Sequence, residues 1–143
     1  MMFFIYFSNK ILYNYKWFPF NKGGNFRKWY GNNEYLVNWE KNGIELKNYA
    51  AKKYKSWSRT IKNVNYYFCK GITWSTISSK APSFRAFDKG FIISNSGQGI
   101  YLNDNKYNYY LLGLLNTNYS SYILNFLSPT LGFESGYIRK IPV

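Results

Sequence analysis

The sequence predicts an α+β domain in which a mixed β-sheet is accompanied by few helices. Three observations lead to this expectation. Short apolar and aromatic runs alternate with glycine and asparagine turn signals along most of the chain. Helical spacing of apolar residues is found in two places, at 44–57 and 107–127. A chain of 143 residues is long enough to bury one hydrophobic core.

The N-terminal part is predicted to consist mainly of strands. Residues 1–20 are almost continuously apolar and aromatic, which is typical of one or two strands. Lys-Gly-Gly at 22–24 then indicates a turn. Short strands are expected at 26–30 and 35–39, on either side of a Gly-Asn-Asn turn at 31–33.

A second turn at 42–43 leads into the first expected helix. Its apolar positions follow helical spacing at Ile44, Leu46, Tyr49, Ala50, Tyr54 and Trp57. Lysines lie between them, so we expect a basic amphipathic helix.

The middle of the chain returns to strand patterns. Residues 66–79 are β-branched and aromatic and suit strands broken near Gly71. The segments 84–87 and 90–94 are expected to form a hairpin. Residues 96–99 follow as a loop or bulge.

The clearest helix signal lies at 107–127, and its expected buried stripe is Leu111, Leu115, Tyr119, Tyr122, Ile123 and Phe126. Asn-Thr-Asn at 116–118 offers N-cap residues, so the segment is either two short helices or one kinked helix. Pro129 ends it, and 137–143 is expected to be a final strand or the entry into a following segment.

Charge and aromatic content favour binding to an anionic partner. The net charge is +13, from 19 Lys and Arg against 6 Asp and Glu, and aromatic residues make up 23% of the chain. Nucleic acid, an anionic membrane surface and an acidic polymer all fit this balance. Tyrosine and tryptophan suit wet interfaces as well as cores, because each combines an apolar body with a polar tip.

Self-contained catalysis has little support. The chain has no histidine, which removes the usual general base and the commonest metal ligand. Its carboxylates are scattered, and the single Cys69 is expected to be a small buried hydrophobe. Gly-Gln-Gly at 97–99 lacks a third glycine and a following helix, which favours a bulge over a cofactor loop.

The opening residues 1–16 remain unplaced beside a domain predicted at 17–143. The run MMFFIYF is too short to span a bilayer and lacks the basic start and cleavage site of a signal peptide. We therefore expect a cytoplasmic protein that does not use a membrane as a partner.

Three groups of residues are candidates for contacts with an anionic polymer. The first comprises Lys22, Arg27, Lys28, Trp29, Tyr30 and Asn32. The second comprises Lys52, Lys53, Lys55, Ser58, Arg59 and Lys62. The third comprises Thr73, Trp74, Ser75, Ser78, Ser79 and Lys80, with Arg85 nearby. Lysine and arginine bind phosphates, and polar side chains and arginine also read base edges. The aromatic members can equally belong to the core, and the helix lysines can equally form a solvated face.

Five stretches resemble the target-recognition part of adenine-specific DNA methyltransferases. They are KGGNFRKWYGN (22–32), GITWS (71–75), GFII (90–93), LLGLLN (111–116) and RKIPV (139–143). The resemblance is to PglX-type enzymes of BREX phage-defence systems and to related type IIG restriction–modification enzymes, and it covers roughly 17–143. LLGLLN and the final Ile-Pro also resemble specificity subunits of type I restriction systems.

The resemblance implies a module that recognises double-stranded DNA for an enzyme that methylates adenine N6 with S-adenosylmethionine. In that family the catalytic domain carries the cofactor motif and an Asn-Pro-Pro-Tyr motif for the flipped adenine. Neither motif occurs in this sequence. We therefore expect a fragment that is inactive alone, binds no cofactor itself and acts with a catalytic domain in cis or in trans.

Two other functions stay open at this stage. An aromatic-rich module could stack on the sugar rings of a carbohydrate or cell-wall polymer. Alternatively, the chain is an inactive remnant of a methyltransferase gene, with exposed aromatic residues that need a missing partner domain.

Overall fold

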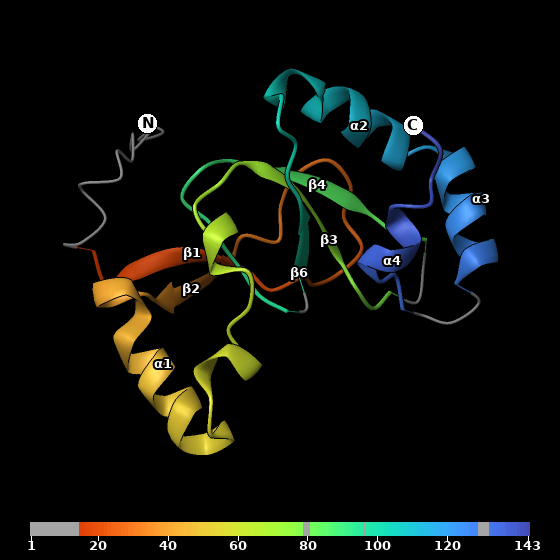
Figure 1. Cartoon of the computed structure of the whole chain (residues 1–143). Coiled ribbons are helices and arrows are strands. Elements are labelled where there is room, and N and C mark those ends of the chain that lie inside the picture. Colours follow the sequence, from red (N-terminus) through yellow and green to blue (C-terminus); the bar gives the residue numbers. More distant parts are fainter. Residues whose placement is uncertain (1–14, 79–80, 96, 129–131) are drawn as a thin grey trace.

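The computed structural model describes residues 15–78, 81–95, 97–128 and 132–143 (Figure 1). The α+β class is confirmed. Within the described residues the strands form two three-stranded sheets rather than one, and the helices follow mainly in the C-terminal part. Residues 1–14, Lys80 and Pro129 lie outside the described residues, as do the expectations that concern them.

The first sheet has the strand order β2-β1-β5 and mixes both pairing directions. β1 (Trp17–Asn21) pairs antiparallel with β2 (Tyr35–Asn38), and parallel with β5 (Ile92–Ile93). Phe18, Trp39 and Ile92 form the buried centre of its core.

The first helix follows β2 and packs mainly against the 3₁₀ turn at Trp57–Arg59. α1 (Glu40–Tyr54) opens with left-handed backbone angles at 41–43, so the expected turn is present and the right-handed helix follows it. Gly43 lies against the Trp39 ring, where a Cβ would come within 2.6 Å of ring carbons. Two 3₁₀ turns, Trp57–Arg59 and Val64–Tyr66, lead back toward the second sheet.

The second sheet is antiparallel, with the order β4-β3-β6. β3 (Gly71–Ser75) is its central strand, between β4 (Phe84–Phe87) and β6 (Gly97–Ile100). The predicted hairpin of 84–87 with 90–94 is therefore wrong, because β4 pairs with β3 whereas β5 pairs with β1. The loop predicted at 96–99 is also wrong from Gly97 onward.

Helices cover the second sheet. α2 (Asn108–Leu115), which follows a 3₁₀ turn at Asn105–Tyr107, is separate from α3 (Asn118–Leu127), so the expectation of two short helices is confirmed. The Thr117 side chain caps α3 by accepting a hydrogen bond of 3.2 Å from the Ser120 backbone N–H. The core beneath contains Ile72, Trp74, Phe84, Leu111, Leu112, Leu115, Leu124, Phe133, Ile138 and Ile141.

Two C-terminal expectations are wrong. Of the two alternatives for 137–143, the final strand is wrong, because a short helix, α4 (Ser135–Ile138), is followed by an irregular end. The predicted stripe is buried on α2, whereas on α3 only Ile123 packs partly against the core and Tyr119, Tyr122 and Phe126 are 55%, 76% and 81% exposed. The break between the helices changes the direction of α3, so that Ser120 and Leu124 face inward instead.

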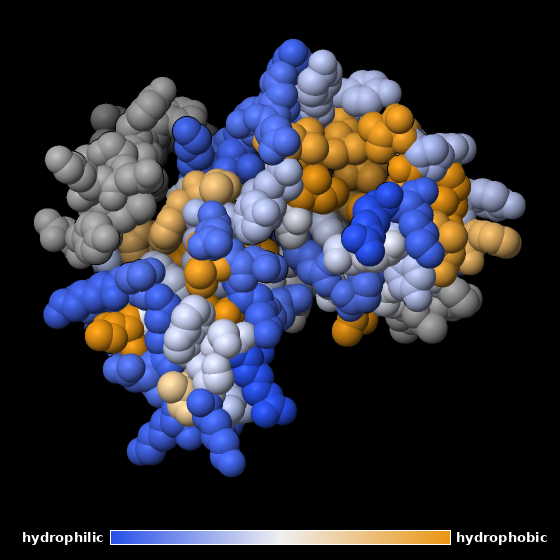
Figure 2. All heavy atoms as spheres, in the orientation of Figure 1, coloured by the Kyte–Doolittle hydropathy of each residue, from blue (hydrophilic) through white to orange (hydrophobic). Residues whose placement is uncertain are grey.

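The surface divides by polarity. Figure 2 shows hydrophilic side chains over α1 and apolar surface near α2 and α3. None of the helices in the described part of the chain combines the length and apolar character needed to cross a membrane.

Cys69 is exposed, so its predicted burial is wrong.

Candidate nucleic-acid interface

The segment that joins β1 to β2, which we call the 22–34 loop, crosses from the first sheet to the second. Its expected strand at 26–30 is wrong, because it makes only an isolated parallel bridge between Trp29 and Arg85. The Trp29 N–H donates to the Phe84 carbonyl at 2.8 Å, and the Trp29 carbonyl accepts from the Ala86 N–H at 2.9 Å. The loop is thereby fixed to the edge of β4.

Four neighbouring side chains of the 22–34 loop are exposed. Phe26, Trp29 and Tyr30 are 43%, 54% and 61% exposed, and the Arg27 side chain is 56% exposed. Large aromatic side chains are usually buried in a domain with its own core. Their exposure beside a cation gives this loop the composition of a surface that binds nucleic acid through stacking and charge.

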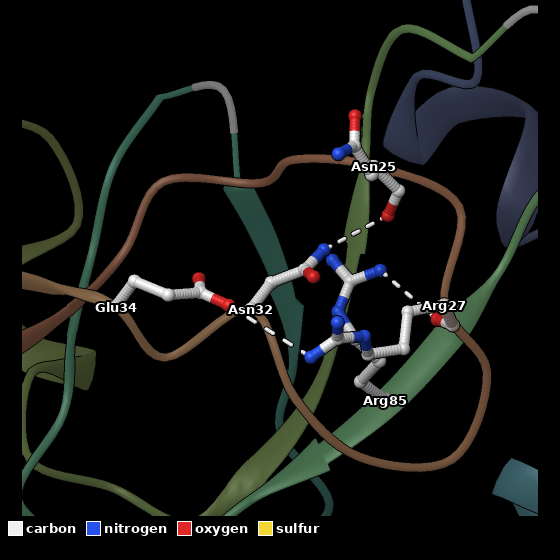
Figure 3. Close-up of polar contacts among 5 residues, drawn as sticks. All are labelled: Asn25, Arg27, Asn32, Glu34 and Arg85. Carbon is white, nitrogen blue, oxygen red and sulfur yellow. Dashed lines mark hydrogen bonds and ion pairs between the residues drawn. The ribbon is translucent and has the colours of Figure 1, made fainter.

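A buried arginine supports the loop from below. Arg85 is 1% exposed, and its guanidinium donates to the Arg27 carbonyl at 3.2 Å (Figure 3). The same guanidinium donates to the Ser83 carbonyl at 3.3 Å. It also donates to the Ser75 hydroxyl, which in turn donates to the Gly24 carbonyl at 2.8 Å. Because the Arg27 carbonyl lies on the loop and the Ser75 hydroxyl lies on β3, Arg85 links the two.

The charge of Arg85 is costly in this position. Burial, and to a smaller extent the neighbouring Arg27, lower the pKa of Arg85 to about 10, while Glu34 acts in the opposite direction. Its Nε has no hydrogen-bond partner within the described part of the chain. Nearby charge of the opposite sign would stabilise this site.

Arg27 is only loosely held by its carboxylate partner. Its Nη1 lies 3.8 Å from Glu34 Oε1, and both side chains are more than half exposed (Figure 3). Such surface pairs contribute about 0–1 kcal/mol. Arg27 can therefore exchange Glu34 for a phosphate or a base edge at little cost.

The shape of the loop depends on two further residues. Asn32 is 5% exposed, and its side-chain amide donates to the Asn25 carbonyl at 2.9 Å (Figure 3). Gly31 has φ +120°, and a Cβ there would clash with the Arg27 side chain, lying 2.8 Å from Nη1. The predicted contact of Asn32 with DNA is therefore wrong. Its side chain is buried and holds the loop together through the bond to Asn25.

The two lysines of the first group differ in their surroundings. Lys22 is exposed, with its Nζ 5.0 Å from the centre of the Tyr35 ring. Lys28 is half-buried and donates to the Asn116 carbonyl at 2.8 Å, where α2 ends. A cation at a helix C-terminus is favourable, so Lys28 attaches the loop to α2.

The second predicted group is exposed but lies elsewhere. Its members on α1 and just beyond it are all exposed: Lys52, Lys53, Lys55 and Arg59. α1 packs against β2 and the 3₁₀ turn at 57–59, and Figure 1 shows it well apart from β3 and β4. The structure therefore does not bring this group together with the 22–34 loop.

For most of the third group, the predicted contact with DNA is wrong. Thr73, Trp74 and Ser75 are buried in the central strand β3, and Arg85 is buried beside them. The Thr73 hydroxyl donates to the Gln98 carbonyl at 2.8 Å, and the Trp74 indole N–H donates to the Phe133 carbonyl at 2.6 Å. DNA on the surface cannot reach these side chains. Ser78 is half-buried and Lys80 lies outside the described residues.

Sequence reasoning missed Lys70 and Tyr109, which approach the loop from other elements. Both line a pocket with Trp29 and Tyr30. Tyr109 lies outside the apolar stripe of its helix, so helical spacing could have indicated that it faces solvent. Nothing in the sequence indicated that it lies beside the 22–34 loop.

Two predictions about metal and cofactor motifs can be compared with the described part of the chain. Within them, no three His, Cys, Asp or Glu side chains gather as a metal site would require. Gly97 and Gly99 lie in β6, paired with β3, and an irregular segment follows β6. The segment is therefore part of a paired strand and does not lead directly into a helix.

Comparison with known proteins relates the chain to part of two methyltransferases. It is 39% identical over 132 residues to an adenine-specific methyltransferase, BrxX, of Escherichia coli O9:H4 (strain HS). It is 39% identical over 127 residues to an adenine-specific methyltransferase, PglX, of Lacticaseibacillus casei (strain Zhang). These alignments cover 91% and 89% of this chain, but only 10% and 11% of the relatives. No family model matches the sequence.

Proposed function

We propose that this chain is a DNA target-recognition element of a BREX-type, S-adenosylmethionine-dependent adenine-N6 DNA methyltransferase. The 22–34 loop contacts double-stranded DNA, with Arg27, Trp29 and Tyr30 at its centre. Methyl transfer is carried out by a catalytic domain that acts in cis or in trans and holds the cofactor.

The exposed aromatic and basic side chains of the 22–34 loop are the observation that carries this proposal. They sit on a backbone that is hydrogen-bonded to β4 and supported by the buried Arg85. Binding residues are most effective when a rigid scaffold positions them. The similarity to segments of two adenine-specific methyltransferases supports DNA as the partner.

The basic surface of α1 provides a second, sequence-independent contact in this proposal. Lys52, Lys53, Lys55 and Arg59 are exposed around the end of the helix. Lysines on a helix bind phosphates as point charges and fix register without reading bases. Recognition is therefore assigned to the 22–34 loop and additional affinity to α1.

The direct test measures the affinity of the chain for duplex DNA by fluorescence anisotropy at several salt concentrations. Each phosphate contact contributes about 0.9 to the slope of log affinity against log salt. We expect a steep slope, weaker binding by Arg27→Gln and a slope reduced by about one in that variant. Lys140→Gln is the matched control, since it removes the same charge from an exposed residue outside both surfaces.

Three outcomes would contradict the proposal. An affinity for DNA that does not depend on salt would show that the chain makes no phosphate contacts. Equal losses of DNA affinity in Arg27→Gln and Lys140→Gln would show that the effect comes from the net charge of the chain and not from a contact made by Arg27. Binding to a polysaccharide, without binding to duplex DNA, would favour the carbohydrate function.

A further inference from the structure

A pocket of about 340 Å³ lies where the 22–34 loop meets α2 and the end of β4. Its volume is within the range of roughly 300–1,000 Å³ that is typical of sites for small ligands. Trp29 and Tyr30 line it from the loop, and Tyr109 lines it from α2. Residues far apart in the sequence thus form one concave site.

The walls of this pocket are aromatic and open to solvent. Trp29, Tyr30 and Tyr109 are 54%, 61% and 67% exposed, respectively. Its floor is apolar and formed by side chains of the core, with Phe87 only 2% exposed and Leu112 only 5% exposed. A pocket with aromatic walls and an apolar floor suits a flat ring that can stack.

The backbone conformation of Trp29 points to a functional role for its ring. Its φ is +75°, a left-handed value that is rare for a bulky side chain. Two backbone hydrogen bonds to β4 impose this conformation. Backbone strain of this kind is commonly found at ligand sites. Here it coincides with an indole that lines the pocket.

Polar groups at the rim define the ligand further. Lys70 lies there with its Nζ 5.3 Å from the centre of the Tyr109 ring, where it can meet a phosphate. Asp88 is exposed at the same rim, and a carboxylate accepts hydrogen bonds from an exocyclic amine. The ligand thus carries a stacking ring, an amine and a negative charge.

We infer that this pocket binds one unpaired nucleobase together with its backbone phosphate, stacked among Trp29, Tyr30 and Tyr109. The inference rests on the proposed function and adds to it. Duplex DNA lies along the 22–34 loop, and a base displaced from the helix enters the pocket beside it. Adenine, guanine and cytosine carry an exocyclic amine that can donate a hydrogen bond to the Asp88 carboxylate, whereas thymine does not.

The test uses the full chain and DNA that contains a single 2-aminopurine, a fluorescent base that is quenched by stacking. One duplex carries this base in a normal pair, and a second carries it opposite an abasic site, where it can leave the helix easily. Affinity is measured by anisotropy and stacking by quenching. Stacking contributes about 1–3 kcal/mol per base, so we expect at least about fivefold tighter binding to the second duplex, with quenching.

Variants separate the pocket from the rest of the interface. Tyr109→Ala should abolish the preference and the quenching, Tyr109→Phe should keep both, and Tyr122→Ala should change neither. Tyr122 is a suitable control because it is also an exposed helix tyrosine, at 76% against 67% for Tyr109, and does not line the pocket. A circular dichroism melt of each variant checks that the substitution at an exposed residue leaves the fold intact.

The outcomes distinguish this inference from the proposed function. Equal affinity for both duplexes, or a preference that survives Tyr109→Ala, would overturn the pocket inference while duplex binding stands. Binding to the unpaired base without binding to normal duplex would support the pocket and overturn the proposed function. Failure to bind either DNA would overturn both.

Discussion

Trp29 offers a prediction in which two variants differ in stability but lose DNA binding to the same extent. The residue has φ +75°, although it is neither glycine nor asparagine. Replacing it with alanine removes the indole but keeps a Cβ in the left-handed region. Replacing it with glycine removes the indole and the Cβ together. Comparing these two variants isolates the backbone strain, because both lose the same ring.

The expected difference follows from two opposing contributions. A left-handed residue with a Cβ costs about 1–2 kcal/mol. Glycine avoids this cost, but its greater freedom in the unfolded chain destabilises it by about 0.5–1 kcal/mol relative to alanine. We therefore expect Trp29→Gly to be more stable than Trp29→Ala by about 0.5–1 kcal/mol.

The free energy of unfolding is measured by urea titration, where a change in midpoint at constant slope reports stability. Leu36 in β2 is the matched control, since it is 62% exposed and has an ordinary negative φ. At Leu36 the difference in free energy of unfolding between the two variants should have the opposite sign, with Leu36→Gly less stable than Leu36→Ala by about 0.5–1 kcal/mol. Both Trp29 variants should bind DNA at least about fivefold more weakly than the native chain, because stacking on the indole is lost. If Trp29→Gly is the less stable of its pair, the strain argument is refuted.

Further predictions concern the support of the loop, a helix cap and pH. Gly31→Ala should weaken DNA binding and destabilise the chain by at least about 1 kcal/mol, because the new Cβ meets the Arg27 side chain at a positive φ; unchanged affinity and stability would contradict the loop geometry. Thr117→Ala should lower the free energy of unfolding by about 1 kcal/mol through loss of its cap to the Ser120 N–H, and Thr117→Ser should restore most of it in the same urea titration. Burial raises the pKa of Tyr101 above the ordinary tyrosine value of about 10, so its contribution to stability is complete below that pH and is lost as the pH rises. Tyr101→Phe should therefore lose less stability than the native chain between about pH 9 and pH 11, and equal losses would show that Tyr101 is not the responsible group.

Elements that depend on local signals could be predicted from the sequence. The helix after the turn at 42–43 and the break between α2 and α3 follow from spacing and capping within a few residues. Strand pairing depends on distant partners, and here the prediction failed. β4 and β5 looked like a hairpin, but they pair with β3 and β1 in separate sheets. Gly97 lies so close to the Asn21 carbonyl that a Cβ would come within 2.6 Å of its oxygen, a contact that no local pattern indicates.

The candidate site shows the same division. Arginine and tryptophan are compatible with a DNA surface and with an interior, and the sequence could not separate these roles. Arg27 and Trp29 are exposed, whereas Arg85 and Trp74 are buried. The buried pair belongs to strands covered on both faces, and the exposed pair belongs to a loop at the sheet edge. Tyr109 joins the exposed pair only through the packing of α2 on β4.

The five tryptophans allow the most direct test of where DNA binds. Trp29 and Trp17 are similarly exposed, at 54% and 57%, but lie in the 22–34 loop and in β1, while Trp74 is 1% exposed. Their indole N–H signals can be followed by NMR while duplex DNA is added. We predict that the Trp29 signal shifts or broadens with DNA concentration, and that Trp17 and Trp74 remain in place. A shift at Trp17 with an unchanged Trp29 signal would contradict the assignment of the 22–34 loop as the DNA-binding surface.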